Sequence, residues 1–281
     1  MRGALIGRVR ALFNDAGRGE APVVRSDAAL YPPGSVIWRV HGDVTSMMIG
    51  GVSALLMQML HPAALAGVWD HSSFRGDMLG RLRRTARFIA VTTYGERDLA
   101  EAAIEKVRYV HTRVTGTLAD GTPYRASDPR LLAWVHACEA LCFLDAWIRY
   151  GEPGMTLADQ DRYFAEAAGV AVALGAAPVP TTRAGIIALI AGFRGELVAD
   201  ARTHEVAEMI LSQPAPSLIA APVQKMLFEA AVDLLPRWAR QMHGRDVSLP
   251  ARPLVRTGSA VVAGALRWAF APYRTAAQDT R

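Results

Sequence analysis

The sequence has few of the residues that stabilise extracellular proteins. Only two cysteines occur in the 281 residues, Cys138 and Cys142, and they lie one helical turn apart. Side chains at that spacing suit packing better than a disulfide bridge. The sequence therefore predicts two reduced core thiols and a cytoplasmic protein.

Motifs for zinc and di-iron sites are also missing. No His-Glu-x-x-His occurs, and His204-Glu205 lacks the second histidine. The Glu-x-x-His pairs of di-iron helical bundles do not occur either. These absences weigh against zinc hydrolases and ferritin-like oxidases.

Features of nucleic-acid-binding and secreted proteins are weak. The net charge of +5 is not gathered in long Lys/Arg blocks, and aromatic residues are 7% of the chain. No nucleic-acid partner is therefore expected. Residues 1–30 have basic and apolar residues at helical spacing but no long apolar run, so they are interpreted as an N-terminal helix and linker rather than a secretory signal. Weak peripheral contact with an anionic membrane is compatible with this charge.

Apolar residues are abundant and favour closely packed helices. They make up 51% of the chain, with many Ala, Leu and Val. We predict one all-α domain of about nine to ten helices over residues 31–274, followed by a frayed tail at 275–281. Val44 to Leu60 is expected to be a buried central helix capped by Asp43, not a transmembrane segment, because it contains polar residues and a glycine pair. Asp128-Pro129 predicts the start of a second long helix.

Two further helices are predicted between Gly80 and Gly116, with a break at Tyr94-Gly95. On the first, a polar and cationic stripe has helical spacing. On the second, apolar residues recur at helical spacing and His111 lies within them. The stripe consists of Arg81, Arg84, Thr85, Phe88 and Thr92, and the apolar face of Leu99, Ala103, Val107, Val110 and Val114.

His111 has two interpretations. An imidazole in an apolar wall that faces a few fixed donors matches the chemistry of a haem pocket, where histidine binds iron. A single histidine on an apolar helix face also occurs as a hydrogen-bonded core residue. Spacing alone leaves both open.

The order Arg-x-x-Arg-Thr and then Val-Arg-x-x-His resembles the MpaB and rubber-oxygenase (latex clearing protein) family. Further similarity lies in LHPAALAGVWDHSSF from Leu60 to Phe74 and DPRLLAWVHA from Asp128 to Ala137. The resemblance is good over Pro33 to Asp200 and looser beyond. It implies an all-α fold, and the characterised rubber oxygenases of the family carry haem b.

The resemblance also implies roles for single residues. His111 corresponds to the proximal iron ligand, and Arg81, Arg84 and Thr85 to distal-side residues. The rubber oxygenases have Lys where this chain has Arg84, and a guanidinium, which stays protonated, is a poor iron ligand. The acidic residue proposed as base in rubber cleavage has no secure match, Asp70 being the nearest. These departures argue against rubber as the substrate.

Other polar residues have secondary expectations. Arg81, Arg84 and Arg108 are candidates to pair with haem propionates, because guanidinium suits carboxylates. His61 and His71 are expected to anchor a loop near the pocket, and one of them is the second choice for the axial ligand. His136 and Glu139 lie at i, i+3 and are expected to pair structurally or to support the pocket.

Together these features predict a haem b-dependent oxygenase that acts with O2 on an apolar small-molecule or isoprenoid-like substrate. His111 is the predicted metal ligand, and Arg81, Arg84 and Thr85 are the predicted catalytic side chains. The alternative is a haem-binding or apolar-ligand-binding protein without turnover, such as a sensor or carrier.

Overall fold

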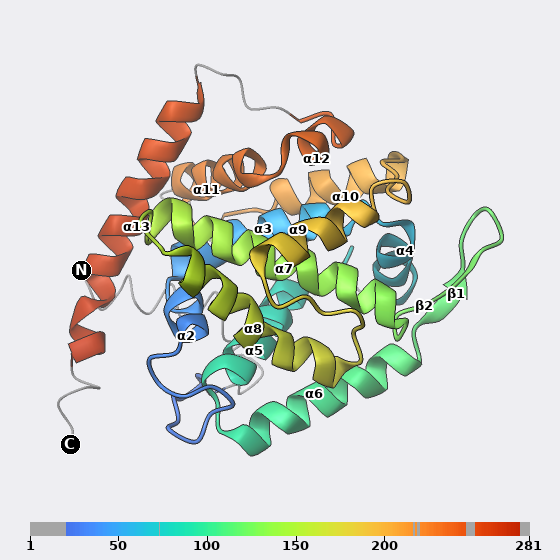
Figure 1. Cartoon of the computed structure of the whole chain (residues 1–281). Coiled ribbons are helices and arrows are strands. Elements are labelled where there is room, and N and C mark those ends of the chain that lie inside the picture. The colour runs from blue at the N-terminus through green and yellow to red at the C-terminus, as the bar shows by residue number, and fades with distance from the viewer. Residues whose placement is uncertain (1–20, 73, 216, 218–219, 246–250, 276–281) are drawn as a thin grey trace.

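The computed structural model describes residues 21–72, 74–215, 217, 220–245 and 251–275. Within them the chain forms twelve helices and one small antiparallel sheet (Figure 1). The elements are α2 (Val36–His41), α3 (Val44–Gln58), α4 (Pro62–His71), α5 (Met78–Tyr94), α6 (Arg97–Thr112), β1 (Thr115–Thr117), β2 (Pro123–Arg125), α7 (Pro129–Tyr150), α8 (Leu157–Leu174), α9 (Arg183–Gly192), α10 (Ala201–Leu211), α11 (Ala221–Leu234), α12 (Arg237–Met242) and α13 (Ala251–Thr275).

The all-α prediction is confirmed, but the helix count was too low. Two helices, α2 and α12, have only six residues, too short for a clear periodic pattern. Pro62 also starts α4 directly after the central helix, because proline is tolerated at the first helical position. The predicted N-terminal helix and the tail from residue 276 lie outside the described residues.

The centre of the molecule is the packing of α3 against α7 (Figure 1). Both helices start at predicted caps, since Asp43 accepts the Ser46 N–H and Asp128 accepts the Arg130 and Leu131 N–H groups. A Cβ at Gly50 would lie 2.8 Å from the Cys142 carbonyl oxygen. Glycine at this position therefore lets the two helix backbones approach closely.

Helix α7 is long and apolar enough to cross a membrane, but 72% of that stretch is buried inside the protein. Together α3 and α4 meet the same criterion, with a bend of 103° between them. The core helix of a soluble protein has the same length and composition. The prediction that Val44 to Leu60 is a buried central helix agrees with the ten buried side chains of α3.

Helices α5 and α6 form a hairpin that is only partly buried. Asp77 caps α5 by accepting the Gly80 N–H, and the chain turns at Gly95 as predicted. No side chain from Arg81 to Val91 is fully buried, and on α6 only Ala100 and Ile104 are. The hairpin therefore rests on the body through a narrow contact.

The predicted apolar face of α6 was wrong by about one residue. Leu99 is 61% exposed and Val110 is 48% exposed, whereas Ala100 and Ile104 are buried. A shift of one residue turns a helix face by about 100°. His111 follows Ala100 and Ile104 at helical spacing, so it remains on the inner side of the helix and is partly buried.

The predicted small hairpin after α6 is confirmed. Strands β1 and β2 pair antiparallel around a turn in which Gly121 has φ +88°. His71 Nε2 is 3.0 Å from the Thr115 carbonyl oxygen, and the Tyr124 hydroxyl donates to Asp70 at 2.8 Å. His71 is therefore a loop anchor, as expected, and Asp70 holds the hairpin on α4.

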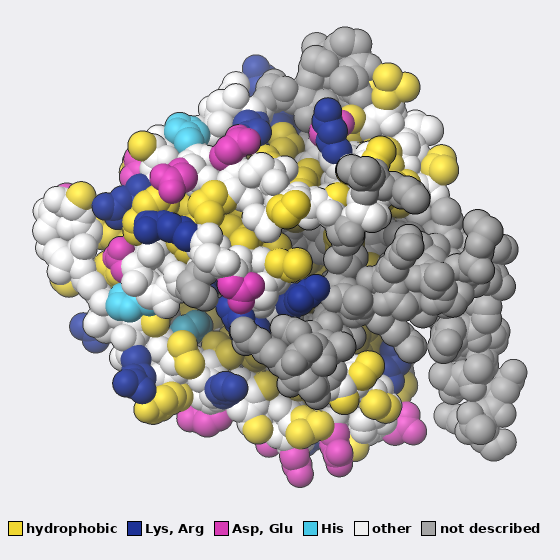
Figure 2. Space-filling view, turned by 180° about the vertical axis from the view of Figure 1, so that it is seen from behind, with side chains coloured by type: hydrophobic (Ala, Val, Ile, Leu, Met, Phe, Trp, Pro, Cys, Tyr) yellow, Lys and Arg dark blue, Asp and Glu magenta, His cyan; other side chains and the backbone are white. Residues whose placement is uncertain are grey.

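The C-terminal helix α13 docks on the body, against α11, α3 and α7. Val255, Ser259 and Ala263 are its buried side chains among those described. Arg256 Nε lies 2.7 Å from the buried carboxylate of Asp233. Seen from behind the view of Figure 1, the molecule shows basic, acidic and apolar side chains interspersed on its surface (Figure 2). The net positive charge is thus spread over this face rather than gathered in one patch.

Candidate functional site

The stripe on α5 runs from an exposed end to a buried end. Arg84 and Thr85 are exposed near the start of the helix, Phe88 is partly buried and Thr92 is buried. The helical spacing predicted from the sequence is therefore present as one face. Its inner end lines a small cavity in the core.

At the exposed end of the stripe the two arginines have different surroundings. Arg81 Nη1 lies 3.3 Å from the Ser72 hydroxyl, and burial, followed by the nearby charge of Arg84, lowers the pKa of Arg81. Arg84 Nη1 lies 3.3 Å from the Asp77 carboxylate. The Thr85 hydroxyl donates back to the Arg81 carbonyl oxygen at 3.2 Å. Arg84 is thus the more accessible cation, because a surface ion pair holds it only weakly.

His111 lies level with this end of the stripe. His111 follows Gly95 by 16 residues, which corresponds to roughly 24 Å along α6. Arg81 precedes Gly95 by 14 residues, which corresponds to roughly 21 Å along α5. The contact between His71 and Thr115 joins the end of α4 to the residues after α6. The lengths of the two helices alone therefore put His111 and Arg81 at similar distances from the turn of the hairpin.

The imidazole of His111 has an unused ring atom. Its Nδ1 is buried and has no hydrogen-bond partner in the described part of the chain. Burial lowers the pKa of His111, which favours the neutral ring. A neutral imidazole is the form that binds metal ions.

Arg108 lies in solvent on α6 and pairs with Glu105 at 3.0 Å. It precedes His111 by three residues on the same helix. Arg108 thus lies about one helical turn before His111, and its exposed side chain is paired with Glu105 on the same helix. Its role towards a propionate stays a prediction.

The buried end of the stripe lines a cavity that was not predicted from the sequence. This cavity, of about 60 Å³, lies between α2, α5, α7 and α8. Only the i, i+3 spacing of His136 and Glu139 on α7 indicated it. Its polar lining consists of His41, Thr92, Thr93, His136, Glu139, Tyr163 and Tyr31.

His136 and Glu139 do not form the hydrogen-bonded pair that was expected. The Nε2 atom of His136 is buried without a partner, and no hydrogen bond of Glu139 is found within the described residues. Burial lowers the pKa of His136 to about 4 and raises the pKa of Glu139 to about 7. Both groups therefore favour their uncharged forms.

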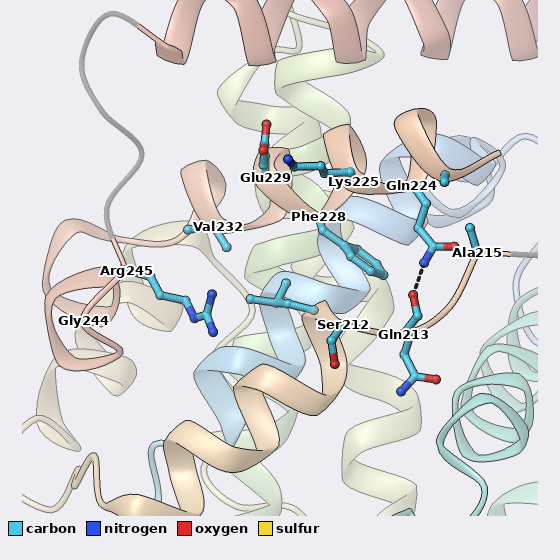
Figure 3. Close-up of a pocket in the computed structure, with 12 residues that line it drawn as sticks. Ser212, Gln213, Ala215, Gln224, Lys225, Phe228, Glu229, Val232, Gly244 and Arg245 are labelled. Carbon is cyan, nitrogen blue, oxygen red and sulfur yellow. Dashed lines mark hydrogen bonds between the residues drawn. The ribbon is translucent and has the colours of Figure 1, made fainter. Parts of the chain in front are cut away.

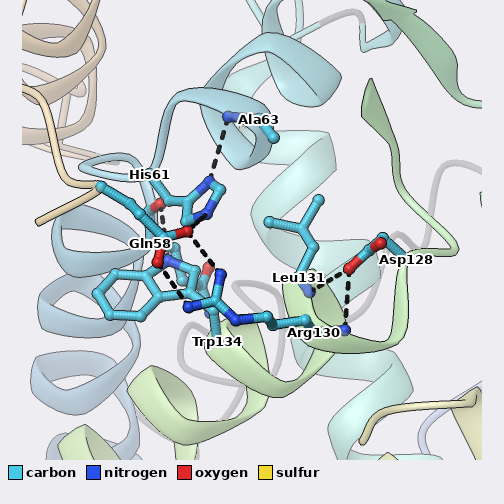
Figure 4. Close-up of polar contacts among 8 residues, drawn as sticks. Gln58, His61, Ala63, Asp128, Arg130, Leu131 and Trp134 are labelled. Carbon is cyan, nitrogen blue, oxygen red and sulfur yellow. Dashed lines mark hydrogen bonds and ion pairs between the residues drawn. The ribbon is translucent and has the colours of Figure 1, made fainter. Parts of the chain in front are cut away.

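His61, the second choice for an axial ligand, is engaged elsewhere (Figure 4). Its Nδ1 accepts the Ala63 N–H at 3.2 Å, and its Nε2 lies 3.9 Å from Glu196. Glu196 in turn binds the Arg130 guanidinium through both carboxylate oxygens. Nδ1 of His61 therefore caps α4, whereas Nε2 faces Glu196 beyond hydrogen-bond distance. Its role as an axial ligand stays a prediction.

A larger pocket lies at another place, between α10, α11 and the residues after α12 (Figure 3). It has a volume of about 620 Å³, within the range of ligand pockets. No histidine is among the described residues that line it. The lining residues are Leu211, Ser212, Gln213, Ala215, Ala221, Gln224, Lys225, Phe228, Glu229, Val232, Gly244 and Arg245. It does not contain the predicted site.

The residues of the α5–α6 hairpin fit a haem by their chemistry. One buried, unpartnered imidazole suffices as a side-chain ligand for haem iron, and His111 provides it. Arg81 and Arg84 offer guanidinium groups for propionates. The cavity of about 60 Å³ beneath the stripe is much smaller than a ligand pocket. His111, Arg81 and Arg84 are not among the residues that line this cavity.

In the described residues, no three His, Cys, Asp or Glu side chains gather as a metal site. Neither the curated proteins nor the solved structures include a match to this chain. The profile of the family described as "ER-bound oxygenase mpaB/B'/Rubber oxygenase, catalytic domain" matches residues 38–269. This range covers most of the chain and includes both the hairpin and the α3–α7 core. The protein thus belongs to the MpaB/rubber oxygenase catalytic domain family.

Proposed function

We propose that the chain is a haem b-dependent oxygenase that acts with O2 on an apolar small molecule. Membership of an oxygenase family supports the reaction class. The observation that supports haem as the cofactor is the Nδ1 atom of His111, which lies on the inner side of α6 and is buried without a partner among the described residues. An imidazole that is buried without a partner loses hydrogen bonds to water, and binding to a cofactor accounts for that cost.

The residues of the hairpin have separate roles in this proposal. His111 would hold the iron, in its neutral form, and the guanidinium groups of Arg81 and Arg84 would bind the propionates or line the oxygen side. Bound haem supplies the activation of O2 that protein side chains lack. The Thr85 hydroxyl, which now donates within its own helix, is the nearest neutral donor to Arg84.

The surroundings of the stripe favour an apolar substrate. Phe88, on the stripe itself, is partly buried and offers apolar surface near the cations, whereas Leu82 and Ile89 pack against the hydrophobic core. Such side chains would exclude water from the reacting groups and orient a hydrocarbon without hydrogen bonds. An isoprenoid-like substrate matches this surface.

The test is the visible spectrum of the purified protein loaded with haemin. We expect a Soret band that changes when O2 meets the reduced protein. His111→Ala should lose most of the haem while keeping its helical circular dichroism. The matched control is His204→Ala, because His204 is exposed on α10 and contacts only the Met242 carbonyl oxygen at 3.3 Å.

Three outcomes would contradict parts of the proposal. A protein that takes up no haemin would remove the cofactor. Full haem content in His111→Ala would move the ligand to another residue. A haem that stays six-coordinate and inert to O2 would favour the non-catalytic carrier or sensor.

A further inference from the structure

The partly open cavity between α2, α5, α7 and α8 is small and is lined by many polar groups. Its volume of about 60 Å³ accommodates roughly two water molecules at about 30 Å³ each. Buried waters typically make two to four hydrogen bonds to polar groups that otherwise lack partners. The cavity has polar groups from all four of its helices, with hydroxyls, imidazoles and one carboxyl group.

Two kinds of polar side chain line this cavity. His41 uses both ring nitrogens, since Nδ1 lies 2.9 Å from the Thr93 hydroxyl and Nε2 lies 3.1 Å from the Tyr163 hydroxyl. Nε2 of His136 is buried and has no partner among the described residues, and Glu139, which is partly buried, makes no hydrogen bond to them. Packing alone would favour an apolar residue at position 136, because an unpaired buried polar group destabilises the fold.

We propose that the cavity is a hydrated proton-transfer site, in which bound water links the Glu139 carboxyl group to His136 Nε2 and to the hydroxyl groups held by His41. At rest, both Glu139 and His136 are uncharged. Glu139 donates to water, and water donates to His136. The i, i+3 spacing puts the two side chains on one face of α7, within reach of the same water.

The proton step is balanced within the pair. The O–H bond of Glu139 breaks, the proton passes through water, and an N–H bond forms at His136 Nε2. The products are a carboxylate and an imidazolium, so the net charge of the site does not change. The reverse transfer restores the neutral pair, and no electrons leave the site.

The groups that face Glu139 from each element support the neutral resting state. They are His41 on α2, Tyr163 on α8, Tyr31 before α2, and His136 and Cys142 on α7. Helix α5 contributes Phe88, Ile89, Thr92 and Thr93, none of which titrates in the physiological range. No cation lines the cavity in the described part of the chain. Burial therefore raises the pKa of Glu139 to about 7 and lowers that of His136 to about 4.

The use of this proton rests on the proposed oxygenase function. Phe88 and Thr92 belong both to the α5 stripe and to the cavity lining, so the cavity lies directly beneath the inner end of the stripe. A carboxyl group that still carries its proton near neutral pH is able to supply it to oxygen chemistry farther along the same face of α5. Glu139 would act through water and is therefore a positioning residue.

The first experiment needs no haem. We would label the glutamate carboxyl carbons with ¹³C and follow their NMR signals between pH 4 and 9 in the apoprotein. The signal that is absent in Glu139→Gln should titrate near pH 7. His136→Gln should lower this midpoint by roughly 0.5–1 pH unit, the equivalent of one lost hydrogen bond.

The matched control is Glu101→Gln, because Glu101 is exposed on α6 and should leave this signal unchanged. A Glu139 midpoint among the surface glutamates, at about 4.3, would overturn the proposal. A midpoint that does not respond to His136→Gln would also overturn it, since the two groups would then share no water.

The second experiment uses the haem-loaded protein. Glu139→Gln should lower turnover about tenfold or more at unchanged haem content, and Glu139→Asp should restore part of it with a shifted pH profile. Wild-type turnover in Glu139→Gln would contradict the use of the proton in catalysis. If the protein binds no haem, the proposed function fails, while the apoprotein titration still decides whether the proton site exists.

Discussion

The α3–α7 core and the α5–α6 hairpin are built on opposite principles. In the core, helices approach so closely that Gly50 has no room for a Cβ, and Trp134 is fully buried with its Nε1 donating to the Gln58 carbonyl oxygen at 3.2 Å. In the hairpin, α5 carries four arginines, and no side chain from Arg81 to Val91 is fully buried. Buried polar atoms without a partner among the described residues occur in both regions, such as the Thr45 hydroxyl oxygen on α3 and Nδ1 of His111 on α6.

This difference separates stability from chemistry. Close packing and satisfied hydrogen bonds supply most of the folding free energy. Partly covered helices contribute less to stability, and proteins retain them where they bind or react. The core is therefore expected to hold the fold, and the hairpin, together with the polar cavity beneath it, to hold the function.

The largest effect should come from the core. Trp134→Ala should lower the free energy of unfolding by about 3–5 kcal/mol, because it leaves a large cavity beside α3. Phe88→Ala, on the partly buried stripe of α5, should cost clearly less. Urea unfolding followed by circular dichroism measures both, and equal losses would erase the distinction between the two regions.

The second prediction concerns the close helix contact. Gly50→Val should destabilise the protein by about 1–3 kcal/mol or more, because the new side chain would meet the backbone of α7 at Cys142 and Phe143. Gly192→Ala is the matched control, since nothing lies within 4 Å of a Cβ at that helical position. The control should be neutral or stabilising. Thermal melts of both variants make the comparison.

The third prediction is a pH dependence that comes from the polar cavity. The folded state raises the pKa of Glu139 from 4.5 to about 7, so it holds this proton more tightly than the unfolded chain. The contribution of Glu139 to stability is therefore full below pH 4.5 and is lost as the pH rises to about 7. Glu139→Gln should remove this loss and be more stable than wild type at pH 8, by roughly 1–3 kcal/mol.

His136 works in the opposite direction in the same experiment. Its folded pKa of about 4 lies below the usual 6.5, so stability is lost as the pH falls through that interval. Unfolding curves of wild type and Glu139→Gln from pH 4 to 8 isolate the glutamate contribution, because His136 is present in both. A stability difference that does not change with pH would contradict the buried, protonated carboxyl group.

The smallest effect on stability should come from the exposed end of the stripe. Arg84→Ala removes only a partly exposed ion pair with Asp77, so unfolding should change by less than about 1 kcal/mol. We expect haem to be retained and oxygen chemistry to be impaired. Arg97→Ala, which removes another exposed ion pair, is the control for both readouts. Loss of haem in Arg84→Ala would instead assign Arg84 to propionate binding.

Much of the local structure was predictable because its causes are local. Asp43, Asp77 and Asp128 cap their helices through backbone groups two or three residues away. The spacing of Arg81, Thr85 and Phe88 follows from the helix alone. The family resemblance also rested on contiguous motifs, and the profile match bears it out.

The site was less predictable because its parts come from distant segments. The polar cavity joins His41, Thr93, Glu139 and Tyr163, which lie on four different helices. A pattern of residues along the sequence does not show which distant segments contact one another in the fold. His61 gave a similar difficulty, since Glu196, which faces its ring, comes from a loop far along the chain.

The sequence by itself determined that this chain is helical, where most of its helices begin, and to which family it belongs. Those properties depend on residues within a few positions of one another. Only the tertiary structure decided which face of α6 turns inward, that His61 faces Glu196, and that His136 and Glu139 line the same cavity. The geometry of a helix fixes the angles between its side chains, but packing against other helices decides which of those side chains are exposed to water.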